Sequence, residues 1–215
     1  MSAIPIETFP ALDAIPFCRH AFTGRVPGLD MQVDRPSALQ KLKRYHEGAR
    51  TNLGLAGLAL ATAEQVHGNL VMVASATTRA GGADGLITDD PAICLGIYVA
   101  DCCAVYLVDV QRRCLGLVHS GRKGTELGVV AAAVGAMESA YGSTPKDIVA
   151  QLSPCIRPPH YEVDIAAAIV KQCESLGLRL VDDCGTCTAC HPDRYYSYRA
   201  ELGRTGRMLA LLALR

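Results

Sequence analysis

The chain has 215 residues, half of them hydrophobic, and its 21 basic and 21 acidic side chains cancel. This composition predicts one folded domain over residues 1–215 rather than a disordered chain, and the balanced charge argues against a nucleic-acid or membrane-surface binder. Segment 1–7 lacks the basic and apolar stretches of a secretory signal, so we expect a cytoplasmic protein whose ten cysteines are free thiols or metal ligands.

The first half of the chain predicts one helix followed by several strands. Asp34 can cap a helix over 36–46, and Gly48 follows its end. Short runs of apolar and β-branched residues then predict strands. A polar break at 111–113 separates the last two of these strands, which predicts a hairpin. The predicted strands cover 70–74, 93–99, 104–110 and 114–118.

The second half predicts helices around one further strand. Residues 125–141 predict a helix with an apolar stripe, and 148–152 predict a strand. Asp164 can cap a helix over 165–176, and the tail 201–212 predicts a third helix. Helices and strands are interleaved, but short connections dominate the middle of the chain. This pattern favours an α+β fold with mixed β-sheets over a doubly wound parallel sheet.

Three residues that bind transition metals end or interrupt apolar runs: His67, Cys102 and His119. Two imidazoles and one thiolate leave the fourth position of a tetrahedral zinc ion open, which is typical of a catalytic site. If the hairpin turns near Arg112, Cys102 and His119 lie at the same end of the sheet, whereas spacing does not place His67. A thiol hydrolase with Cys102 as nucleophile and His119 as base is the alternative.

The segment 184–191 reads Cys-Gly-Thr-Cys-Thr-Ala-Cys-His. It contains the CxxCH pattern of haem attachment, but that chemistry belongs to exported proteins, and the fourth cysteine of an iron–sulfur run is missing. We expect a turn with free thiols near the site, and a second zinc ion held by these residues is the alternative.

Many short motifs occur in the order found in one family. They include Gln65-Val66-His67-Gly68, Ala83-Asp84-Gly85-Leu86-Ile87-Thr88, Ala100-Asp101-Cys102, His119-Ser120-Gly121, Pro154-Cys155-Ile156, Ser197-Tyr198-Arg199 and Thr205-Gly206-Arg207. In this order the chain resembles the laccase-domain family, also called the YfiH-like or polyphenol oxidase family, over nearly its whole length. The resemblance implies a single α+β domain with mixed sheets and flanking helices.

The resemblance also implies a zinc-dependent purine nucleoside enzyme, with copper as a less expected metal. Family members are described as phosphorolysing adenosine, inosine, guanosine and methylthioadenosine, and as deaminating adenosine. The implied partners are therefore a purine nucleoside and phosphate. The family's metal ligands map to His67, Cys102 and His119, the residues selected above by their chemistry. Asp101 is a candidate for orienting a ligand or handling protons.

The chain departs from the family beside His119. The family pattern HAGWRG reads His-Ser-Gly-Arg-Lys-Gly over 119–124, so Arg122 replaces a tryptophan and Lys123 replaces an arginine. Lysine keeps the charge but loses bidentate anion recognition. Arg25, Arg122 and Lys123 are the candidates for binding phosphate. Because the pocket is altered, a non-catalytic metal-binding protein is a further alternative. The sequence does not indicate an oligomeric state.

Overall fold

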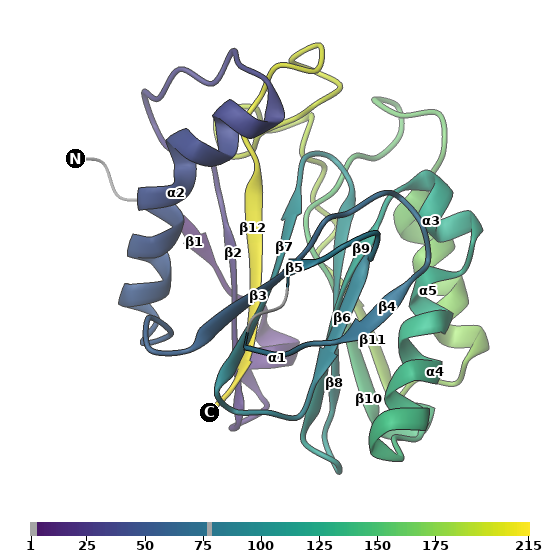
Figure 1. Cartoon of the computed structure of the whole chain (residues 1–215). Coiled ribbons are helices and arrows are strands. Elements are labelled where there is room, and N and C mark those ends of the chain that lie inside the picture. The colour runs from purple at the N-terminus through teal and green to yellow at the C-terminus, as the bar shows by residue number, and fades with distance from the viewer. Residues whose placement is uncertain (1–3, 77–78) are drawn as a thin grey trace.

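In the computed structural model, which describes residues 4–76 and 79–215, two six-stranded sheets pack face to face (Figure 1). The first sheet contains β1 (Ile6–Glu7), β2 (Cys18–Thr23), β3 (Ala59–Ala63), β5 (Arg79–Ala80), β7 (Ile93–Val99) and β12 (Met208–Leu214). The second contains β4 (Val71–Val73), β6 (Gly85–Thr88), β8 (Cys103–Asp109), β9 (Cys114–Ser120), β10 (Ile148–Leu152) and β11 (Leu180–Asp183).

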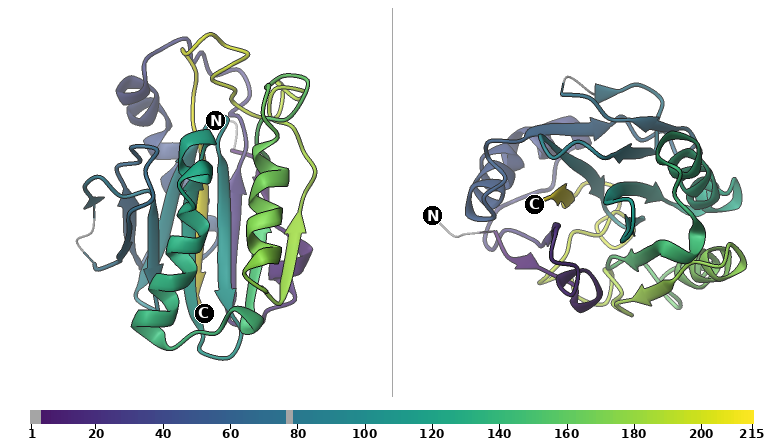
Figure 2. Two further views of the ribbon diagram at one scale, coloured as in Figure 1. Left: turned by 90° about the vertical axis from the view of Figure 1, so that its right-hand side faces the viewer. Right: turned by 90° about the horizontal axis from the view of Figure 1, so that it is seen from below.

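The longer helices lie outside the two sheets (Figures 1 and 2). The described helices are α1 (Pro10–Asp13), α2 (Arg35–Asn52), α3 (Arg122–Glu126), α4 (Val129–Tyr141) and α5 (Ile165–Ser175). Helices α4 and α5 cover the outer face of the second sheet, and α2 lies on the opposite side of the molecule (Figures 1 and 2). Both sheets combine parallel and antiparallel pairs, so the predicted α+β fold with mixed sheets and flanking helices is confirmed.

Two large apolar cores and one smaller cluster hold these layers together. The larger core lies between the sheets, where Ile97 of β7, Tyr106 of β8 and Leu212 of β12 are fully buried. The second core lies between the second sheet and its helices and includes Val105 and Ile169. Because both faces of the second sheet are covered, the ends of its strands are held rigidly in place.

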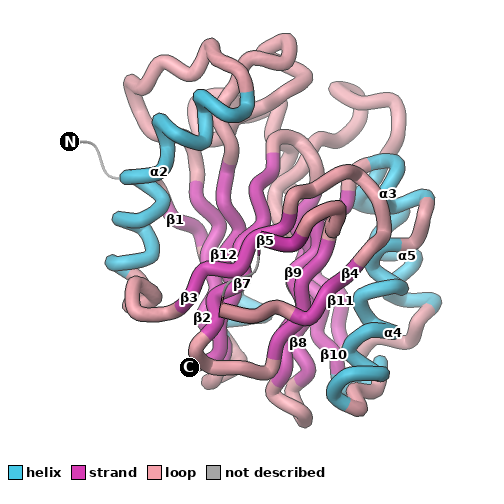
Figure 3. The backbone as a smooth tube through the Cα atoms, in the orientation of Figure 1, coloured by secondary structure: helices cyan, strands magenta, loops and turns pink. Residues whose placement is uncertain are grey.

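The predicted hairpin is present, and it fixes one end of the site. Strands β8 and β9 pair antiparallel with Ala104 opposite His119 and Asp109 opposite Cys114. Cys102 immediately precedes β8, so Cys102 and His119 lie at the same end of the second sheet, as expected from the hairpin. Loops gather at that end (Figure 3).

The predicted helix caps are also confirmed, although two helix boundaries differ. The side chains of Asp34 and Asp164 accept hydrogen bonds from backbone N–H groups three residues on, at 2.9 Å each. Helix α2 continues past Gly48 because its buried face extends to Ala49. The helix predicted over 125–141 is instead two helices, α3 and α4, separated at Gly128 with φ +73°. No helix of the described residues is long and apolar enough to cross a membrane.

The prediction of a helix over 201–212 is wrong. Residues 208–214 form strand β12, which pairs with β2 on one side and β7 on the other. Alanine and leucine favour helices, but every residue of β12 is buried, with Leu212 in the core between the sheets and Leu211 in a cluster on the outer face. A continuous apolar run is typical of a strand covered on both faces. The patterns also do not predict β1, β2, β3, β5, β6, β11 or α1.

Candidate metal centre

His67, Cys102 and His119 meet at one end of the sheets. Cys102 lies where the chain passes from β7 in the first sheet to β8 in the second, and His119 lies near the end of β9. His67 comes from the loop after β3, with its ring centroid 4.9 Å from that of His119. One ligand atom from each residue lies within 4.8 Å of the other two. The structure therefore brings together the three proposed ligands, including His67, which spacing cannot place.

A fully buried carboxylate, Asp84, connects the two histidines. Its Oδ1 lies 2.8 Å from Nδ1 of His119 and accepts a 2.9 Å hydrogen bond from the backbone N–H of His67. Its Oδ2 accepts a 2.6 Å hydrogen bond from the N–H of Gly68. Asp84 thus fixes both the His119 ring and the His67 loop. Its role is not predicted above, although an acidic residue inside an apolar segment is a usable signal, because a buried carboxylate needs partners.

These donors fit a zinc ion. Zinc binds imidazole nitrogen and thiolate sulfur, and catalytic zinc sites keep one position open beyond three protein ligands. Metal-binding histidines usually hydrogen-bond a carboxylate through their other nitrogen, as His119 does with Asp84. Copper accepts the same kinds of donor, so the donor set alone does not separate the two metals. The described residues contain no second group of three or more metal-binding side chains with this proximity.

Glycine at position 121 lets the ligands approach one another. A Cβ atom on Gly121 would lie 2.7 Å from Sγ of Cys102 and 3.2 Å from Cδ2 of His67. A Cβ on Gly124 would lie 3.1 Å from the carbonyl oxygen of Gly68. Gly121 therefore makes room for two of the candidate ligands and Gly124 for the backbone beside His67, roles that are not predicted for segment 121–125.

Electrostatics favour a thiolate at Cys102 facing a protonated His119. Burial opposes ionisation, but the His119 charge and hydrogen bonds from both histidines lower the pKa of Cys102 to about 6. Burial also opposes the charge on His119, but Cys102 and Asp84 raise the pKa of His119 to about 9. A thiolate is the form that binds metals and acts as a nucleophile, so Cys102 suits both chemical alternatives. His119 would release its proton on binding a metal, because only the neutral imidazole is a ligand.

We expect Cys102 to be the fastest thiol to react with iodoacetamide in metal-free protein at neutral pH. Its alkylation rate should rise as the pH passes about 6, because the thiolate reacts. Burial raises the pKa of Cys94 to about 11 and of Cys173 to about 12, so these thiols should react slowly. Peptide mapping by mass spectrometry measures the rates, and added zinc should protect Cys102. A Cys102 rate that rises only at alkaline pH would contradict the expected thiolate.

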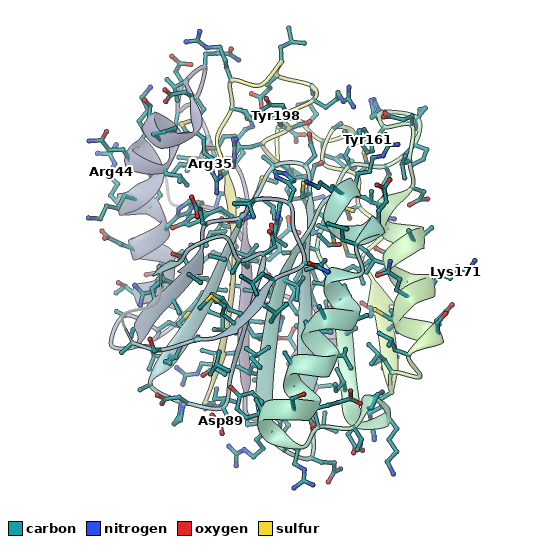
Figure 4. The ribbon with its side chains drawn as sticks, turned by 45° about the vertical axis from the view of Figure 1, so that its right-hand side comes forward. Arg35, Arg44, Asp89, Tyr161, Lys171 and Tyr198 are labelled. Carbon is teal, nitrogen blue, oxygen red and sulfur yellow. The ribbon has the colours of Figure 1, made fainter. Side chains whose placement is uncertain are left out.

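A cavity of about 710 Å³ opens beside the ligands. Its size is in the range of small-molecule sites. Among the described residues that line it, Asp101 is the single acidic one. Oδ1 of Asp101 accepts a 2.7 Å hydrogen bond from Thr188 Oγ1, and Oδ2 accepts a 2.8 Å hydrogen bond from the N–H of Arg199. The aromatic rings of Tyr161 and Tyr198 also line the cavity, at the end of the molecule where Figure 4 labels them.

The structure separates the three basic residues proposed for phosphate. Arg122 lines the cavity but pairs with Glu126 at 3.0 Å. Lys123 lies exposed on α3, outside the residues that line the cavity. Arg25 also lies outside this lining, and its Nη2 pairs with Glu201 at 2.6 Å. Arg25 therefore joins two parts of the chain rather than facing the cavity.

The cysteine-rich tail contains a turn, and its described cysteines form no disulfide. The sulfur atoms of Cys184, Cys187 and Cys190 belong to no three-ligand group found among the described residues. Thr188 lies within this turn, and its hydroxyl holds Asp101. Through Thr188 the tail thus supports an acidic residue of the cavity.

Comparisons with a family model, with known proteins and with solved structures each match most of the chain. The model of the family described as multi-copper polyphenol oxidoreductase laccase matches residues 23–168 and 160–215. A purine nucleoside phosphorylase of Corynebacterium glutamicum is 30% identical, covering 75% of this chain and 77% of the relative. The crystal structure of YlmD from Geobacillus stearothermophilus superposes with a TM-score of 0.84 at 21% identity, covering 96% of this chain and 94% of that one. That of Bacillus licheniformis YfiH gives 0.80 at 22% identity, covering 92% and 93%.

Proposed function

The chain belongs to the family described as multi-copper polyphenol oxidoreductase laccase, and we propose that it is a zinc-dependent purine nucleoside phosphorylase. The observation that carries this proposal is the meeting of His67, Cys102 and His119 beside a cavity of about 710 Å³. The name purine nucleoside phosphorylase, carried by the Corynebacterium glutamicum relative and others, supports the choice of reaction. We further propose purine nucleosides and phosphate as its substrates.

In phosphorolysis, an oxygen of phosphate forms a bond to the anomeric carbon of the ribose. The bond from that carbon to the purine nitrogen breaks, its electron pair stays on the nitrogen, and the nitrogen takes up a proton. The products are a free purine and ribose 1-phosphate. The site must therefore bind an anion, hold the purine and supply one proton.

The residues of the chain divide these tasks. A zinc ion held by His67, Cys102 and His119 would polarise a substrate oxygen. Asp84 keeps Nδ1 of His119 hydrogen-bonded, so the other nitrogen of that ring would be the one available to the metal. Asp101 lines the cavity with both oxygens held in place, and we propose that it handles the proton.

The tyrosines offer surfaces for the base. Tyr161 and Tyr198 both line the cavity, and each is also in contact with an arginine cation, 4.9 Å from Arg199 and 5.9 Å from Arg207 to the ring centroid. An aromatic ring packs well against a flat heterocycle. We propose that these rings contact the purine.

A second candidate function is a thiol hydrolase. The observation that favours it is the Cys102 thiolate beside His119, an arrangement that activates sulfur for nucleophilic attack. The metal and the nucleophilic role need the same sulfur atom, so they exclude each other. In this alternative purified active protein lacks stoichiometric zinc, and added zinc inhibits it.

We expect the zinc-loaded protein to release hypoxanthine from inosine only when phosphate is present. Ribose 1-phosphate should appear in equal amount, because both products come from one bond exchange. Chromatography of a panel of purine nucleosides, with and without phosphate, measures both products. Release of ammonia from adenosine would instead support deamination, the other activity that the family resemblance implies. No turnover of any nucleoside by zinc-loaded protein would contradict the proposed enzyme.

A further inference from the structure

Arginines dominate the charged lining of the cavity beside the metal ligands. Arg35, Arg122, Arg199 and Arg207 line it, against one acidic residue among the described lining residues. Two of the four are already paired, because Arg122 and Arg199 reach opposite oxygens of Glu162 at 3.3 and 3.4 Å. The charges of the other two arginines therefore need a different explanation.

Arg207 is a buried cation without a carboxylate partner. The residue is 8% exposed, and its Nη1 donates to the neutral carbonyl oxygens of Thr205 and Gly206 at 2.9 and 2.7 Å. No described acidic side chain forms an ion pair with Arg207 or with Arg35. Buried charges in proteins are normally paired, so an unpaired arginine facing a cavity indicates a site for an anion.

Arg35 adds a second positive charge beside the first. It begins α2, and its Nη2 donates to the neutral carbonyl oxygen of Glu64 at 3.2 Å. Burial and the charge of Arg35 lower the pKa of Arg207, and the negative charges of Asp101 and Cys102 offset only part of this effect. Both oxygens of Asp101 are already hydrogen-bonded to other groups. An anion bound by the two arginines would remove the repulsion between them.

We propose that Arg207 and Arg35 form a subsite for a tetrahedral oxyanion in this cavity. The guanidinium fork matches the oxygens of phosphate, because two parallel N–H groups can bind two oxygens at once. In the proposed phosphorylase the anion is the attacking phosphate, and only this identification rests on the proposed function. Arg35 and Arg207 line the same cavity as His67, Cys102 and His119, so the subsite lies beside the metal ligands. Arg207 and Arg35 take the place of Arg25 and Lys123, which do not line the cavity.

The test compares the affinity for phosphate of wild type, Arg35→Gln, Arg207→Lys and Arg207→Gln in zinc-loaded protein. Calorimetric titration with inorganic phosphate should show about tenfold weaker binding for Arg35→Gln and for Arg207→Lys, and a larger loss for Arg207→Gln. The affinity of Arg35→Gln for inosine without phosphate should stay within about twofold, because this change leaves the metal ligands, Asp101 and the contact between Arg207 and Tyr198 in place. Arg44→Gln, on the same helix as Arg35 but outside the cavity lining, is the matched control and should bind phosphate normally.

Arg35→Gln keeps the test independent of folding, because the Arg35 side chain is partly exposed and its backbone position in α2 is unchanged.

A titration with adenosine 5′-phosphate separates the two sources of such an oxyanion. Weakened binding of free phosphate supports a phosphate subsite, and weakened binding of the nucleotide alone supports a subsite for the phosphate group of a nucleotide. If Arg35→Gln binds phosphate as tightly as wild type does, and also binds the nucleotide as tightly as wild type does, the proposed subsite is overturned. Phosphorolysis by Arg35→Gln with the KM for phosphate of wild type would also overturn the subsite, but it would support the proposed function. If Arg35→Gln weakens phosphate binding but wild type phosphorolyses no nucleoside, the subsite is supported and the proposed function is contradicted.

Discussion

The Cys102→Ala protein should contain less than about a tenth of the zinc bound to wild type after identical purification, and phosphorolysis should fall by at least about a hundredfold. Cys102 supplies the single sulfur donor of the three-residue group, and two imidazoles alone form a much weaker zinc site. Elemental analysis measures the metal, and release of hypoxanthine from inosine measures the activity.

Cys190→Ala is the matched control for this experiment. Cys190 is an exposed cysteine in the tail, and its sulfur lies outside the three-ligand group, so its removal should leave zinc and activity unchanged. Zinc retained undiminished in Cys102→Ala would contradict the proposed centre. Activity lost in Cys102→Ala from a wild type that contains no zinc would favour the thiol hydrolase instead.

The meeting of two of the three candidate metal ligands could be predicted because their signals are local. Residue types and the hairpin length indicated that Cys102 and His119 share one end of a sheet, and strands β8 and β9 pair in that register. His67 was selected by its type and by the family resemblance, but its position depends on a loop. That loop takes its shape from long-range hydrogen bonds to Asp84, which spacing along the chain does not reveal.

The arginines of the cavity could not be predicted, because the folded structure decides which arginines form ion pairs with carboxylates. Arg25, Arg35 and Arg207 look equivalent in the sequence, but the fold gives Arg25 a carboxylate partner and leaves the other two facing the cavity. The tail shows the same limit for secondary structure. The apolar run 208–214 favours a helix by propensity, and only its position between β2 and β7 makes it a strand.

The Asp84→Asn protein should bind zinc about 10- to 100-fold more weakly than wild type although all three ligands remain. Asparagine has the shape of aspartate but one acceptor oxygen instead of two and no charge. Asp84 accepts hydrogen bonds from the backbone of residues 66–68 and contacts Nδ1 of His119, so one amide cannot satisfy all of these groups. The His119 ring should lose its fixed orientation, and the His67 loop should lose part of its anchor. Competition for zinc with a chromophoric chelator measures the affinity.

Asp109→Asn separates this effect from a general loss of stability. Asp109 is also fully buried and its Oδ1 also accepts two backbone hydrogen bonds, from Gln111 and Arg112, but it lies at the opposite end of β8 from the ligands. Each substitution should lower the free energy of unfolding by about 1–3 kcal/mol, because each weakens hydrogen bonds to a buried carboxylate. Only Asp84→Asn should weaken zinc binding. Equal zinc affinity in the two variants would mean that Asp84 supports the fold and not the metal ligands, because both substitutions remove a buried carboxylate and only that of Asp84 contacts His119.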